Sequence, residues 1–195
     1  MNTRQSSRKK LQQQRAKITF SEQKKISTII AERLSYHPLF LQSQTIASYI
    51  AIQQEIDPST LIQKAWKNKQ TCYLPILKNQ QLIFCEYQPH TLLKKNHFNI
   101  PEPSLTANAC IAPEDIDLVI VPLVGFTEKG QRLGMGAGFY DRSFAFLLNS
   151  PRPNRPFLLG LAYEWQKLTA FTEKNWDVPL NAVITEKQIY FSPTK

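Results

Sequence analysis

The sequence predicts one α/β domain over residues 1–195, a three-layer αβα sandwich with a mostly parallel sheet plus a short antiparallel hairpin. Three observations favour this fold class. Segments with the pattern of strands alternate with amphipathic segments of helical period. Residues 117–122 form a nearly continuous apolar run, which is typical of a central strand buried on both faces. Residues 71–77 and 81–87 have strand patterns on either side of Lys78-Asn79-Gln80, a spacing that predicts a hairpin.

Two helices are expected in the N-terminal part. Residues 4–17 hold no Gly or Pro and are rich in Lys, Gln and Arg, which favours a helix. Its apolar face is thin, so it needs a partner surface or a ligand to become ordered. Ser21 is expected to cap a second helix that ends at His37-Pro38. The apolar face of this second helix has the spacing i, i+3, i+4, i+8 and consists of Ile26, Ile29, Ile30 and Leu34.

Residues 45–52 are rich in Ile and Tyr and predict a strand. Asp57-Pro58 predicts the start of a helix, with Asp57 as its cap and the proline in its first turn. Residues 88–116 carry four prolines and mixed polarity, which indicates a long loop with short elements. Loops of that length are often functional.

A further helix is expected after Gly138 and before Pro151. Residues 157–163 predict another buried strand, and short strands are expected at 182–185 and 188–191. The side chains expected to face inward from the helix are Phe144, Leu147 and Leu148.

The net charge of +9 comes from 24 Lys and Arg against 15 Asp and Glu. Residues 1–33 hold nine cations and two anions, which is seven of the nine net positive charges. Such a segment indicates an anionic partner: nucleic acid, an anionic membrane or an anionic small ligand. The longest uncharged apolar stretch, 118–126, is too short for a membrane helix, and the polar N-terminus lacks the apolar core of a signal peptide. We therefore expect a cytoplasmic protein without a membrane partner.

The three cysteines, Cys72, Cys85 and Cys110, are odd in number and widely spaced, and none forms a C-x-x-C pair. Each lies beside apolar or small residues. The pattern predicts reduced thiols in the core rather than a disulfide or a metal site.

The densest functional signal is the segment 125–142. Four of the six glycines lie between Gly130 and Gly138, after a buried strand and before a helix. Closely spaced glycines allow backbone N–H groups to approach an anion, and the start of the helix adds a favourable dipole. Arg132 can bind phosphate oxygens, and Asp141 could hold a divalent metal ion that bridges phosphates. Neither G-x-x-x-x-G-K-[ST] nor G-x-G-x-x-G is present, so the glycine spacing alone leaves open a structural turn with a capping Asp.

Taken whole, the segment resembles the signature of the 5-formyltetrahydrofolate cyclo-ligase family: a strand ending in V-P, then G-x-x-F, then R-L-G-x-G-x-G-[YF]-Y-D-R. Here Val121-Pro122 ends the strand, Gly125-Phe126 follows with a slight shift, and residues 132–142 match completely. Ala137 stands where many members have Lys or Gly, so a lysine contact to phosphate is missing. The resemblance covers nearly the whole chain and extends to Arg4, Arg8, Glu55, Asp57-Pro58, 98–103, 160–166, 176–180 and 185–186.

The resemblance implies a three-layer α/β sandwich and the ATP- and Mg²⁺-dependent conversion of 5-formyltetrahydrofolate to 5,10-methenyltetrahydrofolate. In that reaction the γ-phosphoryl group moves to the formyl oxygen, N10 attacks, the ring closes and phosphate leaves. Residues 1–20 would contribute a basic helix to the nucleotide site. The expected partner is a folate, with or without a polyglutamate tail, and the protein is expected to be a monomer that does not bind nucleic acid.

The matching residues take their expected roles from the resemblance. Glu55, Arg132 and Tyr140 are expected to be catalytic, and Asp141 and Asp177 to hold Mg²⁺. The expected folate contacts are Ile50, Glu55, Phe98 and Tyr140. The expected ATP contacts are Arg4, Arg8, Arg132, Leu133, Gly134, Met135, Gly136, Ala137, Gly138, Phe139 and Tyr140.

Simpler interpretations remain open for several of these residues. Arg4 and Arg8 could be solvated charges at a frayed end. Glu55 could be an ordinary loop carboxylate, Asp177 a turn cap and Ile50 plain core. Two other functions also remain open: a nucleic-acid-binding module that uses the basic N-terminus, and another phosphate-handling enzyme on a similar scaffold, such as a relative of sugar-phosphate isomerases or CoA transferases.

Overall fold

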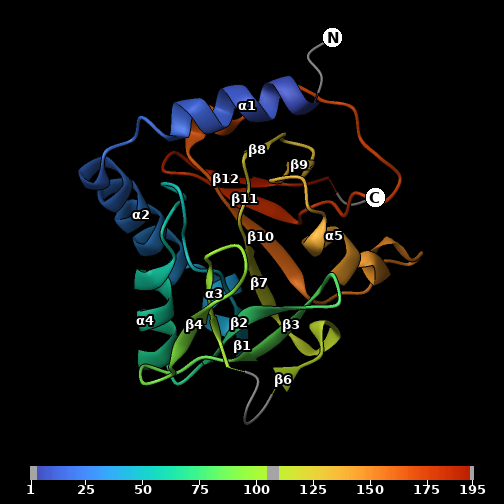
Figure 1. Ribbon diagram of the computed structural model, residues 1–195. Helices are drawn as coiled ribbons and strands as arrows, with labels where there is room; N and C mark the ends of the chain where they lie inside the picture. The colour runs from blue at the N-terminus through green and yellow to red at the C-terminus, as the bar shows by residue number, and fades with distance from the viewer. Residues whose placement is uncertain (1–3, 105–109, 194–195) are drawn as a thin grey trace.

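A mostly parallel sheet forms the centre of the molecule, seen in the computed structural model in Figure 1, which describes residues 4–104 and 110–193. Its strands are β1 (Thr45–Ala47), β2 (Thr71–Lys78), β3 (Gln81–Glu86), β6 (Cys110–Ile111), β7 (Leu118–Val121), β10 (Phe157–Leu161), β11 (Ala182–Ile184) and β12 (Ile189–Phe191). Their order is β12-β11-β10-β7-β1-β2-β3-β6. The strands from β11 to β2 are parallel to one another, whereas β12, β3 and β6 pair antiparallel at the edges. The predicted parallel sheet and the β2–β3 hairpin are therefore confirmed.

Strand β7 is buried on both faces, as its apolar run predicts. Leu118 and Ile120 belong to one apolar cluster, and Val119 and Val121 belong to another. No more than 1% of any of these four residues is exposed. The alternation shows that side chains of one strand fill two separate cores, one on each side of the sheet.

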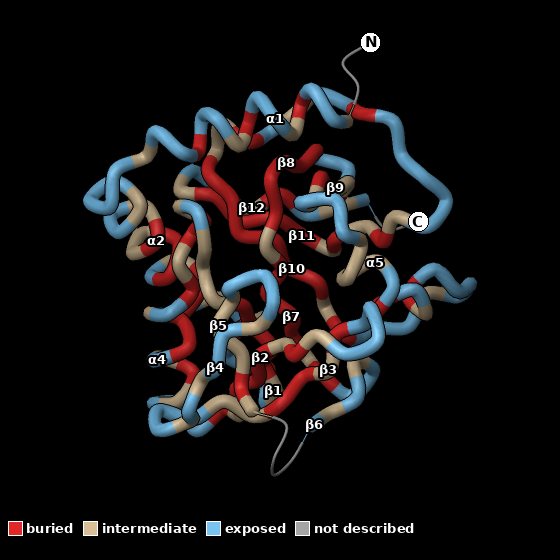
Figure 2. The backbone as a smooth tube through the Cα atoms, viewed as in Figure 1, coloured by how far each residue is buried: buried red, intermediate tan, exposed pale blue. Residues whose placement is uncertain are grey.

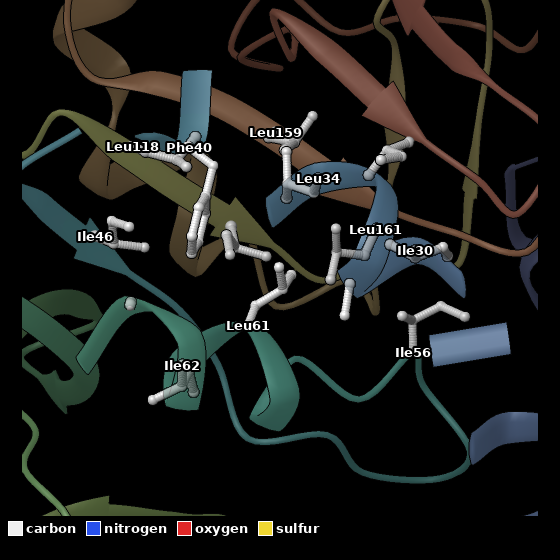
Figure 3. Packing of buried hydrophobic residues seen from close by; sticks show 14 of the residues in the cluster. Ile30, Leu34, Phe40, Ile46, Ile56, Leu61, Ile62, Leu118, Leu159 and Leu161 are labelled. Carbon is white, nitrogen blue, oxygen red and sulfur yellow. The ribbon is translucent and has the colours of Figure 1, made fainter. Parts of the chain in front are cut away.

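Helices cover both faces of the sheet and complete the three layers. On the first face lie α2 (Phe20–Ser35), α3 (Pro38–Gln42) and α4 (Ser59–Lys67). Their side chains, such as Leu34, Phe40 and Leu61, pack against the strands in the cluster of Figure 3. On the second face lie α5 (Phe139–Ser143) and a 3-10 helix (Ala145–Leu148). Phe144, between these two helices, and Leu147 of the 3-10 helix belong to the other cluster.

Two small hairpins and two further 3-10 helices lie outside the central sheet. β4 (Leu93–Lys95) pairs with β5 (Pro101–Pro103), and β8 (Gly125–Phe126) pairs with β9 (Arg132–Leu133). The 3-10 helices are Pro113–Asp115 and Glu164–Gln166. The long segment 88–116 thus contains short elements, as predicted.

Helix α1 (Arg4–Arg15) lies across the top of the molecule in Figure 1, above β8 and β9. Leu11 packs with Val124, Leu133 and Phe171, and a Cβ built on Gly125 would lie 2.7 Å from Leu11 Cδ1. The absence of a side chain at Gly125 therefore allows the helix to approach this closely. Figure 2 shows buried residues alternating with exposed turns along α1. The polar helix has the partner surface that its thin apolar face requires.

Strand β1 ends at Ala47, whereas the sequence predicts a strand to residue 52. The chain then forms a loop, residues 48–58, whose backbone is held by two buried tyrosines. The Tyr49 hydroxyl donates to the Ile56 carbonyl (2.6 Å), and the Tyr163 hydroxyl donates to the Gln54 carbonyl (2.9 Å). These contacts depend on tertiary structure, so strand propensity alone overestimates the length of β1.

Helix α2 is capped by Thr19 rather than by the expected Ser21. The Glu22 N–H donates to the Thr19 hydroxyl (3.2 Å), and the Thr19 N–H donates to the Glu22 carboxylate (2.8 Å). This reciprocal pair is a capping box, which satisfies two backbone donors and so outcompetes a single serine two residues later.

The starts and ends of α4 and α5 also differ from expectation. Pro58 occupies the cap position of α4, and Asp57 accepts a hydrogen bond from the Ser59 N–H (2.9 Å) instead of capping the helix itself. The helix after Gly138 lasts five residues before it tightens into 3-10 geometry. Leu148 consequently faces outward and is 43% exposed, so its predicted inward position is wrong.

The prediction of three reduced cysteines is wrong for two of them. Cys85 and Cys110 form a disulfide, whereas Cys72 is a buried free thiol. Strands β3 and β6 pair antiparallel with these two residues directly opposite, at a Cα–Cα distance of 4.0 Å. The residues are 25 positions apart in the sequence, so only the strand register reveals that they meet.

Thiol titration in denaturant measures the pairing directly. Without reductant, we expect one reactive thiol per chain, from Cys72, and after reduction three. A Cys110→Ser variant is the control and is expected to give two thiols without reductant. Three thiols in the unreduced wild-type chain would contradict the disulfide.

Within residues 4–104 and 110–193, no helix is both long enough and apolar enough to cross a membrane.

Candidate active site

Two loops that carry chemistry meet beside α1. Strands β1 and β7 are parallel neighbours, so the loops that follow them leave the same edge of the sheet. The first loop, residues 48–58, carries Glu55, and the chain after β7 carries the β8–β9 hairpin and the glycine loop, residues 134–138. Arg15 of α1 reaches both chain segments: Nη1 lies 3.4 Å from Glu55 Oε1 and donates to the Leu123 carbonyl (3.1 Å). These three parts form one candidate site.

The glycine loop lies beneath α1. Arg8 Nε donates to the Gly134 carbonyl (2.8 Å), and a Cβ built on Gly136 would lie 3.5 Å from Arg8 Cζ. Gly136 has a φ of +113°, which L side chains rarely adopt. Burial and the nearby Arg4 guanidinium lower the pKa of Arg8. Arg8 therefore faces the predicted phosphate loop and is not a solvated charge at a frayed end.

The remaining loop residues contribute in different ways. Met135 and Ala137 are exposed, whereas the Leu133 side chain is fully buried, so only the backbone of Leu133 can contact a ligand. Gly138 caps α5 without a side-chain hydrogen bond. Because α5 has only five residues, the helix dipole expected from the sequence is small. The cations carry most of the positive potential at this loop.

Arg132 and Asp141 form a tight ion pair at the side of the glycine loop. Arg132 Nη2 donates to Asp141 Oδ1 at 2.6 Å, and the guanidinium carbon lies 5.5 Å from the centroid of the Tyr140 ring. Asp141 also accepts a hydrogen bond from the Val178 N–H (3.2 Å). Asp141 therefore lies beside the segment that carries Asp177.

Arg4 and Asp177 form a second ion pair, in which Arg4 donates through both terminal nitrogens. The Arg4 guanidinium also lies 5.3 Å from the centroid of the Phe171 ring. Asp177 accepts a hydrogen bond from the Lys174 N–H (2.9 Å), which is the turn contact that its simpler interpretation requires. Asp177 thus acts in a turn and also pairs with the helix that covers the glycine loop.

The two aspartates are the candidate metal ligands. Among the residues that the structure describes, no group of three or more His, Cys, Asp or Glu side chains is placed to hold a metal ion. Mg²⁺ is commonly held by one or two carboxylates together with substrate phosphates and water. Asp141 and Asp177 lie on neighbouring segments, and each pairs with one arginine. This arrangement suits a metal ion that arrives with a phosphate chain and does not suit a permanent all-protein metal site.

Glu55 is 6% exposed, which is unusual for a carboxylate. Burial raises its pKa, and the Arg15 guanidinium opposes that rise. The Ile52 N–H donates to Glu55 Oε2 (3.2 Å), and the Gln23 side chain donates to the Glu55 carbonyl (2.5 Å). Glu55 is therefore a buried, fixed carboxylate rather than an ordinary loop side chain.

Aromatic residues extend from Glu55 towards α5. Burial raises the pKa of the Tyr140 hydroxyl; the Arg132 guanidinium opposes this rise, and the Glu55 carboxylate adds to it. Phe98, 49% exposed, lies in the turn of the β4–β5 hairpin, 5.7 Å from the Phe139 ring. Ile50 is half-buried and belongs to none of the apolar clusters found among the described residues, which argues against plain core.

Sequence reasoning missed Arg15 and Tyr49. Arg15 is 2% exposed, and the Tyr49 hydroxyl is close enough to Glu55 for that carboxylate to raise its pKa. A signal for Arg15 was present, because a residue seven positions after Arg8 lies on the same face of a helix.

Part of the basic charge is directed inward. Arg4, Arg8 and Arg15 face the protein, whereas Lys9 and Lys10 are exposed. The inward arginines therefore lie between α1 and the parts of the chain that carry Asp177, the glycine loop and Glu55.

Comparisons with known proteins show which family the chain belongs to. Residues 1–186 match the model of the 5-formyltetrahydrofolate cyclo-ligase family. The Escherichia coli (strain K12) 5-formyltetrahydrofolate cyclo-ligase is 32% identical over 183 residues, covering 92% of this chain and 98% of its own length. The Haemophilus influenzae protein of the same name is 36% identical over 190 residues, covering 92% and 97%. The NMR structure of Aquifex aeolicus 5,10-methenyltetrahydrofolate synthetase has a TM-score of 0.83 at 28% identity and covers 96% of this chain and 92% of that chain.

The fold, the candidate site and these relatives define the chain as an enzyme of the ligase class with a small-molecule folate substrate. Within that class, the chain belongs to the 5-formyltetrahydrofolate cyclo-ligase family, which confirms the family that the sequence motif indicates.

Proposed function

We propose that the chain catalyses the Mg²⁺- and ATP-dependent cyclisation of 5-formyltetrahydrofolate to 5,10-methenyltetrahydrofolate, with release of ADP and phosphate. The observation that carries this proposal is the convergence of three parts in a member of this family: the α1 arginines, the glycine loop with Arg132, and the buried Glu55. Residues 1–195 would act as one catalytic domain to which residues 1–20 contribute a nucleotide-binding helix. We expect a cytoplasmic monomer that accepts folates with or without a polyglutamate tail.

The chemistry requires activation of a formamide, whose carbon is a poor electrophile and whose oxygen is a poor leaving group. Transfer of the γ-phosphoryl group to the formyl oxygen converts that oxygen into part of a phosphate leaving group. N10 attacks the formyl carbon and loses its proton, and the carbon–oxygen bond breaks as phosphate departs. Such a reaction depends mainly on positioning and on stabilisation of developing negative charge.

The nucleotide half of the site would bind the triphosphate through cations and backbone N–H groups. Arg4, Arg8 and Arg132 would bind phosphate oxygens, and residues 133–140 would wrap the chain of phosphates. Asp141 and Asp177 would hold Mg²⁺, which neutralises charge on the phosphates when bound. Arg132 and Asp141 neutralise each other in the ligand-free protein, so binding gives each a new partner of opposite charge.

The folate half of the site would use Glu55 and the aromatic residues. The Glu55 carboxylate can accept hydrogen bonds from the N–H groups of the pterin edge, or from the N10 region of the substrate. Tyr140, Phe98 and Ile50 would flank the flat ring. Tyr140, next to Arg132 and within electrostatic range of Glu55, would lie between the two halves.

The proposal is tested by mixing the purified chain with 5-formyltetrahydrofolate and MgATP and following the near-ultraviolet absorbance of the methenyl product. We expect absorbance to grow in proportion to enzyme and to stop when ATP is omitted or Mg²⁺ is chelated. A folded sample that forms no ATP-dependent product would overturn the proposed function.

Replacing Arg8 by methionine tests the role of α1. We expect the KM for ATP to rise about tenfold, because one charge-assisted contact to phosphate is lost, with a smaller effect on the KM for folate. Steady-state kinetics with each substrate varied in turn measures both constants. Lys9→Met, which removes the same charge from the exposed side of α1, is the matched control. Equal changes in both KM values, or none, would show that Arg8 does not act at the nucleotide.

A further inference from the structure

Arg15 is the last residue of α1 and contacts three separate parts of the site. Its guanidinium donates to the Leu123 carbonyl at the start of the segment that leads to the glycine loop (3.1 Å). The same guanidinium lies 3.4 Å from the Glu55 carboxylate and 4.0 Å from Met135 Sδ in the glycine loop. Within residues 4–104 and 110–193, Arg15 is the residue of α1 that pairs with the Glu55 carboxylate.

A buried guanidinium and a buried carboxylate each require a partner. Arg15 is 2% exposed and Glu55 is 6% exposed, so removal of either leaves an uncompensated charge in the interior. The Arg15 guanidinium therefore favours the ionised form of Glu55, whereas burial disfavours that form and raises the pKa of the carboxyl group.

The backbone around Glu55 is held by other residues. Gln23 donates to the Glu55 carbonyl, Tyr49 to the Ile56 carbonyl and Tyr163 to the Gln54 carbonyl. Arg15, in contrast, contacts the carboxylate group itself. Its role at this loop is therefore to orient and charge one functional group rather than to hold the chain in place.

We propose that Arg15 is a positioning residue, which orients the ionised Glu55 carboxylate towards the folate. Because Arg15 belongs to α1, this orientation depends on the packing of α1 against the glycine loop. The proposal rests on the proposed function for the identity of the ligand. Because Arg4 and Arg8 lie on the same helix, a nucleotide bound by them holds α1 on the loop and so stabilises the contact of Arg15 with Glu55. Nucleotide and folate affinities are then linked, and the linkage is reciprocal.

The coupling has a pH signature that depends on the groups around Glu55. Arg15 faces it from α1, Tyr49 from the segment after β1, Tyr140 from α5 and Tyr163 from the end of β10. Burial raises the pKa of all three tyrosine hydroxyls, so they are neutral near pH 7. Asp57 adds a further negative charge near the Tyr49 hydroxyl. Loss of Arg15 therefore raises the Glu55 pKa, and folate binding that needs the ionised form weakens first at the acidic end.

A double-mutant cycle tests the proposal. Calorimetric titration with 5-formyltetrahydrofolate, with and without a non-hydrolysable ATP analogue, is carried out at pH 6 and pH 8 on the wild type, Arg15→Met, Glu55→Gln and the double variant. We expect Arg15→Met to weaken folate binding about tenfold or more, with a larger loss at pH 6, and to abolish the effect of the nucleotide analogue on folate affinity. In the Glu55→Gln background, the same change is expected to alter folate affinity less than about twofold. Lys17→Met, which removes an exposed charge just beyond α1, is the matched control and is expected to behave as wild type.

The proposal is overturned if Arg15→Met weakens folate binding by the same factor in the wild-type and Glu55→Gln backgrounds. It is also overturned if a folded Arg15→Met variant binds folate as tightly as the wild type. If Arg15→Met does not fold, Arg15→Lys replaces it, because lysine keeps the charge but lacks the planar fork that reaches Leu123 and Glu55 together. Arg15→Lys is then expected to weaken folate binding only beside an intact Glu55, and unchanged binding overturns the proposal. Wild-type protein that binds the folate but forms no product overturns the proposed function alone, whereas wild-type protein that does not bind the folate overturns both.

Discussion

Replacing Arg132 by methionine is expected to lower kcat/KM for methenyl formation about a thousandfold, the size of effect seen for arginines that stabilise phosphoryl transfer. Arg132 is the cation that the β8–β9 hairpin holds beside the glycine loop, on the ring of Tyr140. Methionine retains much of the apolar stem and removes all five donors. Charge that develops on the transferred phosphoryl group would then lack the cation that Arg132 supplies.

Steady-state and single-turnover rates measure this loss, and circular dichroism establishes that the variant is folded. Arg155→Met is the matched control, because Arg155 also pairs with an aspartate, Asp117, at 3.4 Å but has a side chain that is 62% exposed and lies away from the loop. The control is expected to keep wild-type activity. A rate for Arg132→Met within about threefold of wild type would remove Arg132 from the phosphoryl-transfer step.

Replacing Asp141 by asparagine is expected to lower kcat on the order of a hundredfold and to raise the Mg²⁺ concentration needed for half-maximal activity. The change keeps an oxygen that can accept the Val178 N–H, which the aspartate accepts at 3.2 Å. It removes the negative charge that pairs with Arg132 and that would hold the metal ion. The fold is therefore expected to remain intact while the metal dependence changes.

Initial rates measured across a Mg²⁺ series at fixed ATP distinguish this effect from a general loss of activity. Asp115→Asn, a change of an exposed carboxylate in the 3-10 helix before β7, is the control and is expected to leave the Mg²⁺ curve unchanged. An Asp141→Asn variant with reduced kcat but a wild-type Mg²⁺ curve would assign Asp141 to positioning Arg132 instead of to the metal.

Much of the fold follows from local patterns in the sequence. The apolar run at β7 predicts a strand buried on both faces, and the structure divides its side chains between two cores. The polar segment that becomes α1 has too little apolar surface to fold alone, and Leu11 meets the apolar surface that this composition requires. These elements are predictable because each depends on periodicity along one segment.

The errors concern features that depend on distant segments. Strand β1 stops at Ala47 because Tyr163, which is 109 residues away from Gln54 in the sequence, helps to hold the following loop. Cys85 and Cys110 meet because β3 and β6 pair in one particular register. Neither contact leaves a periodic signal near the residues concerned, so propensity and spacing cannot reveal it.

The candidate site divides in the same way. The motif identifies the glycine loop with Arg132, and the spacing of Arg4 and Arg8 places both on one face of α1. Arg15 and its pairing with Glu55 require the three-dimensional packing of α1 against the loop after β1. The arginine that joins the two halves of the site is therefore the part that the sequence motif omits.

Isotope labelling tests whether the chain activates the formyl oxygen by phosphorylation. The most direct measurement uses 5-formyltetrahydrofolate with ¹⁸O in the formyl group, MgATP and unlabelled water, and determines the isotope content of the released phosphate by mass spectrometry. We expect each phosphate formed with the methenyl product to carry the ¹⁸O atom, because the formyl oxygen leaves as part of phosphate. Methenyl product accompanied by unlabelled phosphate would show that the formyl oxygen is not phosphorylated.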